Sequence, residues 1–560
     1  MKIAIAQQNY HIGNFEYNTN KIIDAIRRAK SEGADLVMFS ELSVCGYAPR
    51  DFLEFNDFID RCYQSIEQIK QEADSIAVLV GAPDRNPVRE GKDLFNGAWF
   101  LYEKQVKAVV HKTCLPNYDV FDEYRYFEPS DHWAVVPFKG KKLAITICED
   151  IWNLGDNPLY RNCPMDQLIG QSPDLMLNIS ASPFDYTHVE DRKAIVKLNT
   201  MKYKLPMIYC NAVGSQTEIV FDGGSLVFDR DSNMVAQLPL FEECLRMVEL
   251  GDEGYFKEQV SAAAASLPSQ ELTPEKLDAR LCIPEIHRAI VTGIRDYFQK
   301  MGFSKAILGS SGGIDSAVTL ALAVEALGKE NVRAILMPSE FSSGHSVTDA
   351  EQLSVNLGNP YDTVPIKNIY DSFLKELAPV FGDLPFGLAE ENIQARSRGN
   401  LLMAIANKFG YILLNTSNKS ELATGYGTLY GDMAGGLAVL GDCYKTQVYA
   451  LADYINRDVA IIPRNILEKA PSAELRPGQK DSDSLPEYAV LDALLYQYIE
   501  RRKGPREIKE MGFDPALTDR VLRMVNRNEY KRNQFCPIIR ISPKAFGTGR
   551  RLPIVAHYLS

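Results

Sequence analysis

The segment of residues 260–280, "VSAAAASLPSQELTPEKLDAR", is the feature that most constrains the fold of this chain. It mixes small and polar residues with two prolines, a composition typical of a linker. It divides a chain of 560 residues, and a single hydrophobic core stops growing at roughly 250 to 300 residues. We therefore predict two domains, residues 1–260 and 281–560, joined by a linker at 261–280.

The first domain shows an alternation of strand and helix patterns. Short β-rich runs occur at residues 2–7, 34–39, 76–82, 107–112, 142–148, 174–180 and 207–213. Between the first two runs, residues 18–34 place their apolar positions on one helical face, and Gly33 provides a stop signal. This alternation predicts an α/β sheet that is buried on at least one face.

The second domain repeats this pattern. It begins with an amphipathic helix at 283–302, which Gly302 ends, and continues with a strand at 305–309, a glycine-containing loop and another helix. Further strand candidates at 332–338 and 411–417 follow at the spacing of βαβ units. This spacing favours a doubly wound parallel sheet.

Charge and composition exclude several classes of partner. The net charge of -12 argues against a nucleic-acid or anionic-membrane partner, because both require a basic surface. The N-terminus "MKIAIAQQNY" lacks the apolar region of a signal peptide, and no run of about 18 apolar residues occurs elsewhere. None of the ten cysteines forms a C-x-x-C pair. We therefore expect a cytoplasmic protein with neither a disulfide framework nor a zinc site.

The stretch "LGSSGGIDSAV" at 308–318 has the properties of an anion-binding loop. Gly312 and Gly313 allow a sharp turn with outward N–H groups, and the N-terminus of the following helix adds its dipole. Ser311 and Ser316 can donate hydroxyl hydrogen bonds, and Asp315 can hold a magnesium ion. These residues predict a nucleoside triphosphate site, although a lone Gly-Gly pair is more often only a turn.

The spelling Ser-Gly-Gly-x-Asp-Ser resembles the loop of the ATP pyrophosphatase superfamily, whose fold is adenine nucleotide alpha hydrolase-like. The resemblance implies that the loop grips the β,γ-pyrophosphate as a leaving group while the α-phosphate is attacked. A Walker A loop carries a lysine for γ-phosphoryl transfer, whereas this loop implies adenylylation. The ATP-binding residues that the resemblance implies are Ser310, Ser311, Gly312, Gly313, Ile314, Asp315, Ser316 and Thr416.

Four downstream segments suggest the second substrate. Residues 391–403, 415–436, 443–449 and 542–554 are similar to the NAD synthetase family, which amidates the nicotinic-acid carboxylate of deamido-NAD. The resemblance implies that Glu421 joins Asp315 on magnesium. It also implies deamido-NAD binding by Arg396, Asp432, Lys445 and Lys544. The alternative for Lys544 and the "GTGRR" segment beside it is a solvated basic tail.

In the first domain, Glu41, Lys112 and Cys148 each end or closely follow a strand-like run. Side chains at the carboxyl ends of strands gather at one rim of an α/β sheet. Together they can catalyse acyl transfer: the thiolate attacks an amide carbon, Glu41 accepts and returns the proton, and Lys112 stabilises the oxyanion. Taken singly, Cys148 would be ordinary core packing, and the two charged residues would be surface groups.

Three segments around these residues, 40–53, 111–127 and 145–152, are similar to the nitrilase (carbon–nitrogen hydrolase) family. The resemblance implies an α-β-β-α sandwich in which Glu41 is the base, Lys112 aids the oxyanion and Cys148 is the nucleophile. It implies that Glu123 supports the lysine. The glutamine-binding candidates that it implies are Tyr118, Glu149 through its backbone N–H, and Ser182.

The two resemblances together imply one reaction. Glutamine hydrolysis would supply ammonia, ATP would adenylylate deamido-NAD with magnesium, and ammonia would displace AMP to give NAD. Ammonia is mostly protonated in neutral water, so we expect its transfer along a protected path rather than through solvent. Members of the family usually assemble into homo-oligomers, and we expect the same here.

Two alternatives remain. One is another amide synthetase of the pyrophosphatase type, similar to GMP synthetase. The other is a non-catalytic nucleotide-binding regulator with a decayed amidase, against which the intact set of Glu41, Lys112 and Cys148 speaks.

Overall fold

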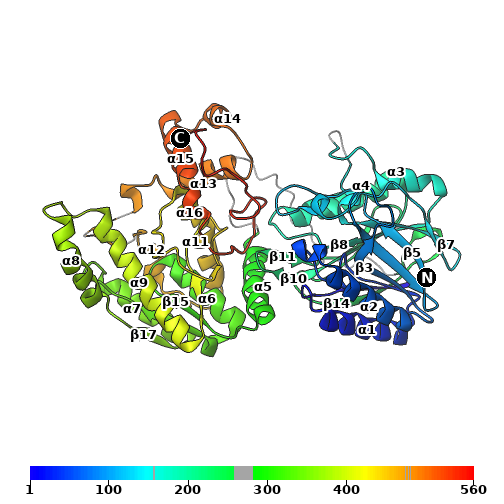
Figure 1. Ribbon diagram of the computed structural model, residues 1–560, viewed down its shortest axis with the longest axis horizontal. Helices are drawn as coiled ribbons and strands as arrows, with labels where there is room; N and C mark the ends of the chain where they lie inside the picture. The colour runs from blue at the N-terminus through cyan, green and yellow to red at the C-terminus, as the bar shows by residue number, and fades with distance from the viewer. Residues whose placement is uncertain (155–157, 258–281, 473, 477, 480, 560) are drawn as a thin grey trace. The chain divides into compact units, whose positions relative to one another are not determined.

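The structure is a computed structural model that describes residues 1–154, 158–257, 282–472, 474–476, 478–479 and 481–559 (Figure 1). The chain divides into two compact units, Met1–Ser269 and Gln270–Ser560. The predicted linker at 261–280 lies outside the described residues, so the predicted domain boundaries stay a prediction. Among the described helices, none combines the length and the apolar character needed to cross a membrane.

The first unit contains two six-stranded sheets packed face to face. Their strand orders are β14-β1-β2-β3-β4-β5 and β13-β12-β9-β8-β7-β6, and β10 and β11 form a separate pair. The strands are β1 Lys2–Gln7, β2 Leu36–Met38, β3 Ala77–Arg85, β4 Leu94–Tyr102, β5 Gln105–His111, β6 Val136–Phe138, β7 Lys141–Ile147, β8 Leu175–Ser180, β9 Met207–Asn211, β10 Val213–Gln216, β11 Ile219–Asp222, β12 Leu226–Phe228, β13 Met234–Gln237 and β14 Cys244–Glu249.

Apolar side chains from both sheets fill the layer between them, including Ile5 and Leu79 from the first sheet and Ile145 and Leu177 from the second. Helices α1 (Phe15–Ser31) and α2 (Asn56–Glu72) cover the first sheet, and α3 (Pro164–Leu168) and α4 (His188–Tyr203) cover the second. The predicted α-β-β-α sandwich is therefore confirmed.

Local sequence explains where α1 begins and ends. Its buried face is formed by residues at helical spacing, Ile22, Ala25, Ile26 and Ala29. The helix starts at Phe15, three residues before the predicted start, because the Asn14 side chain accepts a hydrogen bond from Tyr17 N and caps it. It ends at Ser31, just before Gly33, whose φ of +79° only glycine adopts readily.

The second unit is built on a five-stranded parallel sheet of order β17-β16-β15-β18-β19. The strands are β15 Ala306–Gly309, β16 Val332–Leu336, β17 Tyr361–Thr363, β18 Ile412–Asn415 and β19 Leu437–Ala438. Along the chain, β16 and β17 follow β15 and lie on one side of it, whereas β18 and β19 come later and lie on its other side. This change of direction puts a topological switch point at the carboxyl end of β15, where ligands bind in open α/β sheets.

Helices enclose this sheet, as the predicted doubly wound arrangement requires. Helix α9 (Leu388–Phe409) packs through Leu402 and Ala406 against the strands β15, β16 and β18. Helix α6 (Ile314–Leu327) contacts β15 and β16 and packs against α5 (Ile283–Met301) and α11 (Lys445–Ile455). The remaining helices are α7 Gly344–Leu357, α8 Lys367–Phe381, α10 Lys419–Thr424, α12 Arg464–Glu468, α13 Tyr488–Ile499, α14 Pro505–Glu510, α15 Pro515–Arg527 and α16 Glu529–Arg532.

Candidate active sites

The first candidate site lies at the carboxyl ends of strands in the first unit. Glu41 follows β2, Lys112 follows β5, and Cys148 follows β7. The Lys112 ammonium lies 2.7 Å from Glu41 Oε1 and 2.8 Å from both carboxylate oxygens of Glu123. All four of these side chains are buried. The structure therefore brings together Glu41, Lys112 and Cys148, which the sequence analysis placed at the ends of three different strands.

Cys148 begins a short 3-10 helix, Cys148–Ile151, with a φ of +44°. A non-glycine residue in this region of φ is strained and marks a site that the surrounding structure holds in place. The Asp150 carboxylate supplies that restraint by accepting hydrogen bonds from the backbone N–H groups of Thr113 at 3.0 Å, Cys114 at 2.8 Å and Ile147 at 3.0 Å. Asp150 thus joins the cysteine turn to the segment that follows Lys112.

The electrostatics of this cluster keep the thiol protonated at rest. Burial raises the pKa of Cys148 well above its usual value, and the nearby Glu41 raises it further, while Lys112 opposes both. Burial alone would lower the pKa of Lys112, but Glu123 and Glu41 outweigh it and raise that pKa. Burial also raises the pKa of Glu123 to about 7, against the effect of Lys112. Attack by Cys148 therefore requires a base beside it.

The predicted glutamine-binding residues lie in two small groups. The Tyr118 hydroxyl donates to Glu149 Oε1 at 2.9 Å, and the Tyr160 hydroxyl donates to the same oxygen at 3.2 Å. Ser182 Oγ lies instead 2.9 Å from His188 Nε2. Burial raises the pKa of Glu149 to about 7. Sequence reasoning did not single out Tyr160 and His188, because neither lies in the three catalytic segments.

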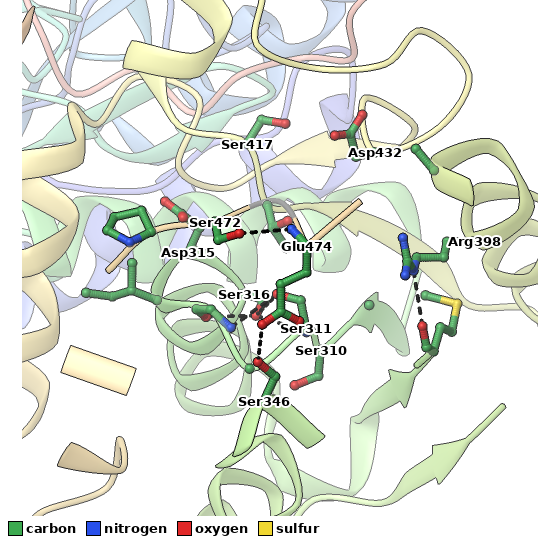
Figure 2. A pocket seen from close by; sticks show the side chains of 18 of the residues that line it. Ser310, Ser311, Asp315, Ser316, Ser346, Arg398, Ser417, Asp432, Ser472 and Glu474 are labelled. Carbon is green, nitrogen blue, oxygen red and sulfur yellow. Dashed lines mark hydrogen bonds between the residues drawn. The ribbon is translucent and has the colours of Figure 1, made fainter. Parts of the chain in front are cut away.

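The second candidate site is a cavity of about 280 Å³ at the carboxyl end of the parallel sheet of the second unit (Figure 2). The predicted residues that line it are Ser310, Ser311, Gly312, Gly313, Ile314, Asp315, Ser316, Thr416, Glu421, Asp432 and Lys445. Two predicted residues do not line it. Arg396 is exposed and donates to the Leu429 backbone oxygen at 3.2 Å, whereas the Lys544 backbone oxygen accepts a hydrogen bond from buried Lys419.

The glycine loop forms the part of this cavity nearest β15. Gly312 has a φ of +76°, and a Cβ there would lie 2.1 Å from the Ser346 backbone oxygen, so no larger residue fits. Ser311 Oγ lies 3.1 Å from Ser316 Oγ and accepts a hydrogen bond from Gly313 N at 3.2 Å. Helix α6 begins directly afterwards and directs its N-terminus at the cavity. This geometry suits a bound phosphate.

Two carboxylates and one lysine gather beside the loop. The Lys445 ammonium lies 2.5 Å from Asp315 Oδ2 and 3.7 Å from Glu421 Oε1. Burial and the nearby charge of Asp315 together raise the pKa of Glu421 to about 8, against the effect of Lys445. Among the described residues, no cluster of three or more His, Cys, Asp or Glu side chains could hold a metal. A pair of carboxylates suits Mg²⁺, which typically takes one or two carboxylates and completes its shell with phosphates and water.

Comparison with known proteins finds a separate family match for each half of the chain. The carbon-nitrogen hydrolase family matches residues 2–253, and the NAD synthase family matches residues 286–535. The glutamine-dependent NAD(+) synthetase of Synechocystis sp. is 44% identical over 561 residues, covering 99% of this chain and 98% of that protein. The chain belongs to the glutamine-dependent NAD(+) synthetase family. The Thermotoga maritima member is 41% identical over 580 residues, covering 100% of this chain and 99% of that protein.

Solved structures of glutamine-dependent NAD(+) synthetases share this fold. The Acinetobacter baumannii protein, solved in complex with ADP, is 38% identical with a TM-score of 0.77, covering 99% of this chain and 98% of that chain. The Cytophaga hutchinsonii protein has a TM-score of 0.81 at 19% identity, also covering 99% of this chain and 98% of that chain, which shows the fold alone.

The synthetase cavity also contains side chains that sequence reasoning missed. Arg398, rather than Arg396, lines it and donates to the Met337 backbone oxygen at 3.1 Å. Helical spacing could have found it, because Ala395, Arg398, Gly399 and Leu402 share the face of α9 that lines the cavity.

Glu474 also lies in this synthetase cavity, where it contacts the start of α7. Its carboxylate accepts a hydrogen bond from Ser346 Oγ at 2.7 Å (Figure 2). It also accepts one from Lys469 Nζ at 2.7 Å. Ser346 is the residue whose backbone oxygen closes over Gly312. These contacts hold Glu474 beside the glycine loop of residues 310–313.

Proposed function

We propose that this enzyme amidates deamido-NAD to NAD, taking ammonia from glutamine and driving the reaction with ATP. The observation that carries the proposal is the presence in one chain of a buried Glu41–Lys112–Cys148 cluster and a glycine loop at the switch point of a parallel sheet. The products would be NAD, AMP, pyrophosphate and glutamate. A cytoplasmic location and a homo-oligomeric state stay predictions.

In the first half-reaction, Cys148 Sγ attacks the amide carbon of glutamine while Glu41 takes the thiol proton. Lys112 and the Glu149 backbone N–H stabilise the oxyanion, and Glu41 returns its proton to the ammonia that leaves. Water then hydrolyses the thioester to release glutamate and the free thiol. The raised pKa of Cys148 explains the need for Glu41, since the thiolate is not formed beforehand.

The substrate glutamine would bind beside this cluster. Tyr118 and Glu149, which hydrogen-bond each other, and Ser182 on the His188 side offer polar groups for its amino and carboxylate ends. Glu123 contacts the lysine rather than an open position, so its role is to support Lys112.

In the second half-reaction, the carboxylate of deamido-NAD attacks the α-phosphate of ATP and pyrophosphate leaves. Ammonia then attacks the acyl adenylate and AMP leaves. The loop of residues 310–316 and Thr416 would hold the phosphates of ATP. Asp315 and Glu421 would hold a magnesium ion, which neutralises charge on the pyrophosphate leaving group. Arg396, Asp432, Lys445 and Lys544 are the proposed deamido-NAD contacts.

The deciding experiment is a product assay with glutamine, ATP, magnesium and deamido-NAD. The proposal predicts NAD, AMP and pyrophosphate in equal amounts. Xanthosine monophosphate in place of deamido-NAD tests the GMP-synthetase-like alternative and should give no product. Formation of ADP and phosphate would contradict adenylylation, and no turnover of any substrate would favour a regulator.

Removal of the nucleophile should separate the two half-reactions. Cys148→Ala should abolish glutamine-dependent synthesis and keep synthesis from ammonium salt, because the thiol acts only in ammonia release. The matched control is Cys210→Ala, which changes a buried cysteine on β9 whose Sγ donates to the backbone oxygens of Ala6 and Met38. Loss of both activities in a folded Cys148→Ala protein would reject separate sites.

The carboxylate pair should be needed with either nitrogen source. Asp315→Asn and Glu421→Gln should each lower NAD synthesis at least tenfold at limiting magnesium, because each removes a charged ligand. Glutaminase turnover, which belongs to the other unit, provides the internal control. A normal rate at limiting magnesium would remove that residue from the set of ligands.

A further inference from the structure

Asn96 is a buried polar side chain that the half-reactions above do not use. It lies on β4 and has no exposed surface. Its Nδ2 donates to Glu41 Oε1 at 2.7 Å and makes a longer contact of 3.4 Å with Glu123 Oε2. One carboxamide therefore reaches both carboxylates that also share the Lys112 ammonium.

We infer that Asn96 is a positioning residue of the glutaminase, which orients the Glu41 carboxylate to take the proton of Cys148. The inference rests on the proposed role of Glu41 as the base. Glu41 Oε1 accepts from Asn96 and Lys112, and Glu41 Oε2 accepts from the backbone N–H of Ala181 at 3.0 Å. Three donors on two oxygens therefore hold the carboxylate in one orientation.

The charge balance explains why a neutral donor suits this position. Glu41 and Glu123 are two acidic groups that share one cation, Lys112, and all three side chains are buried. A second cation would satisfy the same oxygens, but it would add another buried charge, which is costly unless it is fully paired. An amide supplies directed hydrogen bonds without adding charge.

The orientation of the amide is set by the two carboxylates. Asn96 Oδ1 is buried and has no hydrogen-bond partner among the described residues. Exchange of the two amide ends would place this oxygen against the oxygens of Glu41 and Glu123, which repel it. The backbone adds a second restraint, because Lys112 N donates to Asn96 O at 2.9 Å and keeps the lysine beside the amide.

The test is the pH profile of glutaminase turnover in Asn96→Ala and Asn96→Asp. We expect kcat to fall at least tenfold in Asn96→Ala with the KM for glutamine within twofold, and the acid limb of kcat to move to higher pH, because Glu41 loses a donor to its charged form. Asn96→Asp should fall further, since it has the same shape but adds a third carboxylate. Synthesis from ammonium salt should stay unchanged.

The rate of alkylation of Cys148 by iodoacetamide gives a readout that needs no turnover. In Asn96→Ala, the acid limb of the pH profile of this rate should also move to higher pH. It also separates this inference from the proposed function. A wild-type protein without glutaminase activity would reject the proposed function, whereas the pH dependence of alkylation would still decide the role of Asn96. Asn96→Ser, which keeps a small polar side chain, replaces Asn96→Ala if the latter does not fold.

The matched control is Asn178→Ala on β8. Asn178 is also fully buried, donates to Thr146 Oγ1 at 3.0 Å, and has an Oδ1 without a hydrogen-bond partner among the described residues. Its replacement should lower stability without moving the acid limb. An unshifted acid limb in Asn96→Ala, or an equal shift in Asn178→Ala, would overturn the positioning role.

Discussion

At the scale of single residues, the first site contains several buried charged side chains, and Glu149 is one of them. Glu149 is 5% exposed, and among the residues that the structure describes its side chain has no ion-pair partner; its carboxylate accepts hydrogen bonds from the hydroxyls of Tyr118 and Tyr160. Neutral donors compensate a buried carboxylate incompletely, which is why its pKa rises to about 7. A stability cost at neutral pH is therefore built into the site.

This cost predicts the effect of Glu149→Gln. The pKa of Glu149 is about 7 in the folded protein and 4.5 ordinarily, so between these values the folded state binds more protons than the unfolded state. Stability contributed by this group therefore falls as pH rises from 4.5 to 7, by at most about 3 kcal/mol. Glu149→Gln should raise the unfolding temperature at pH 8 and leave it nearly unchanged at pH 5.

The control for this prediction is Glu54→Gln, which changes an exposed glutamate of the same unit. It should alter the unfolding temperature equally at both pH values. An equal effect of Glu149→Gln at pH 5 and pH 8 would show that the burial of Glu149 does not cost stability in the ionised form.

At the scale of elements, the second site depends on one connection, the loop between β15 and α6. Four residues must leave the strand, turn and start a helix whose N-terminus faces the cavity. Gly312 makes this possible, because its positive φ turns the chain where the backbone of Ser346 at the start of α7 closes over it. The loop and α7 therefore fit each other only while position 312 has no side chain.

Gly312→Ala should abolish NAD synthesis with both glutamine and ammonium as nitrogen source, because the clash with Ser346 O displaces the loop. Glutaminase turnover should persist. Gly302→Ala is the matched control: its φ is +73° but its surroundings are open, so we expect a cost of about 1 kcal/mol in stability and normal synthesis. Normal ATP-dependent synthesis by Gly312→Ala would show that the loop tolerates displacement.

At the scale of the whole molecule, one chain joins two units with different chemistry. A separate amidase and a separate synthetase could perform the same reactions, but ammonia released to neutral water would mostly become ammonium, which is no nucleophile. Joining the units is useful if ammonia reaches the adenylate without mixing with solvent. We therefore predict that glutamine nitrogen is used in preference to nitrogen from the bulk.

An isotope experiment checks this preference. Glutamine labelled with 15N in its amide group is supplied with excess unlabelled ammonium, at a pH where ammonia is partly unprotonated, and the mass of the NAD formed is measured. The fraction of label should exceed the fraction in the bulk well beyond error. Cys148→Ala under the same conditions should give unlabelled NAD. Label equal to the bulk fraction in the wild-type protein would reject direct transfer.

Sequence alone determined the local features of this protein. Strand runs ending in Glu41, Lys112 and Cys148, and a glycine loop between a strand and a helix, are set by neighbouring residues, so the segments and their motifs could be predicted. The buried face of a helix, with residues such as Ile22 and Ile26, could be predicted as well, because the periodicity of apolar residues within one segment indicates which of them are buried.

Only the tertiary structure decided which distant residues meet. Asn96 lies on β4, a strand that the alternation analysis did not single out, and it contacts Glu41 across 55 positions of sequence. Lys445 lies beside Asp315 across 130 positions, and Arg398 lines the cavity where Arg396 does not. Such pairings depend on sheet order, on the angle at which a helix packs, and on the loops between them. These are properties of long-range packing, and a local pattern does not contain them.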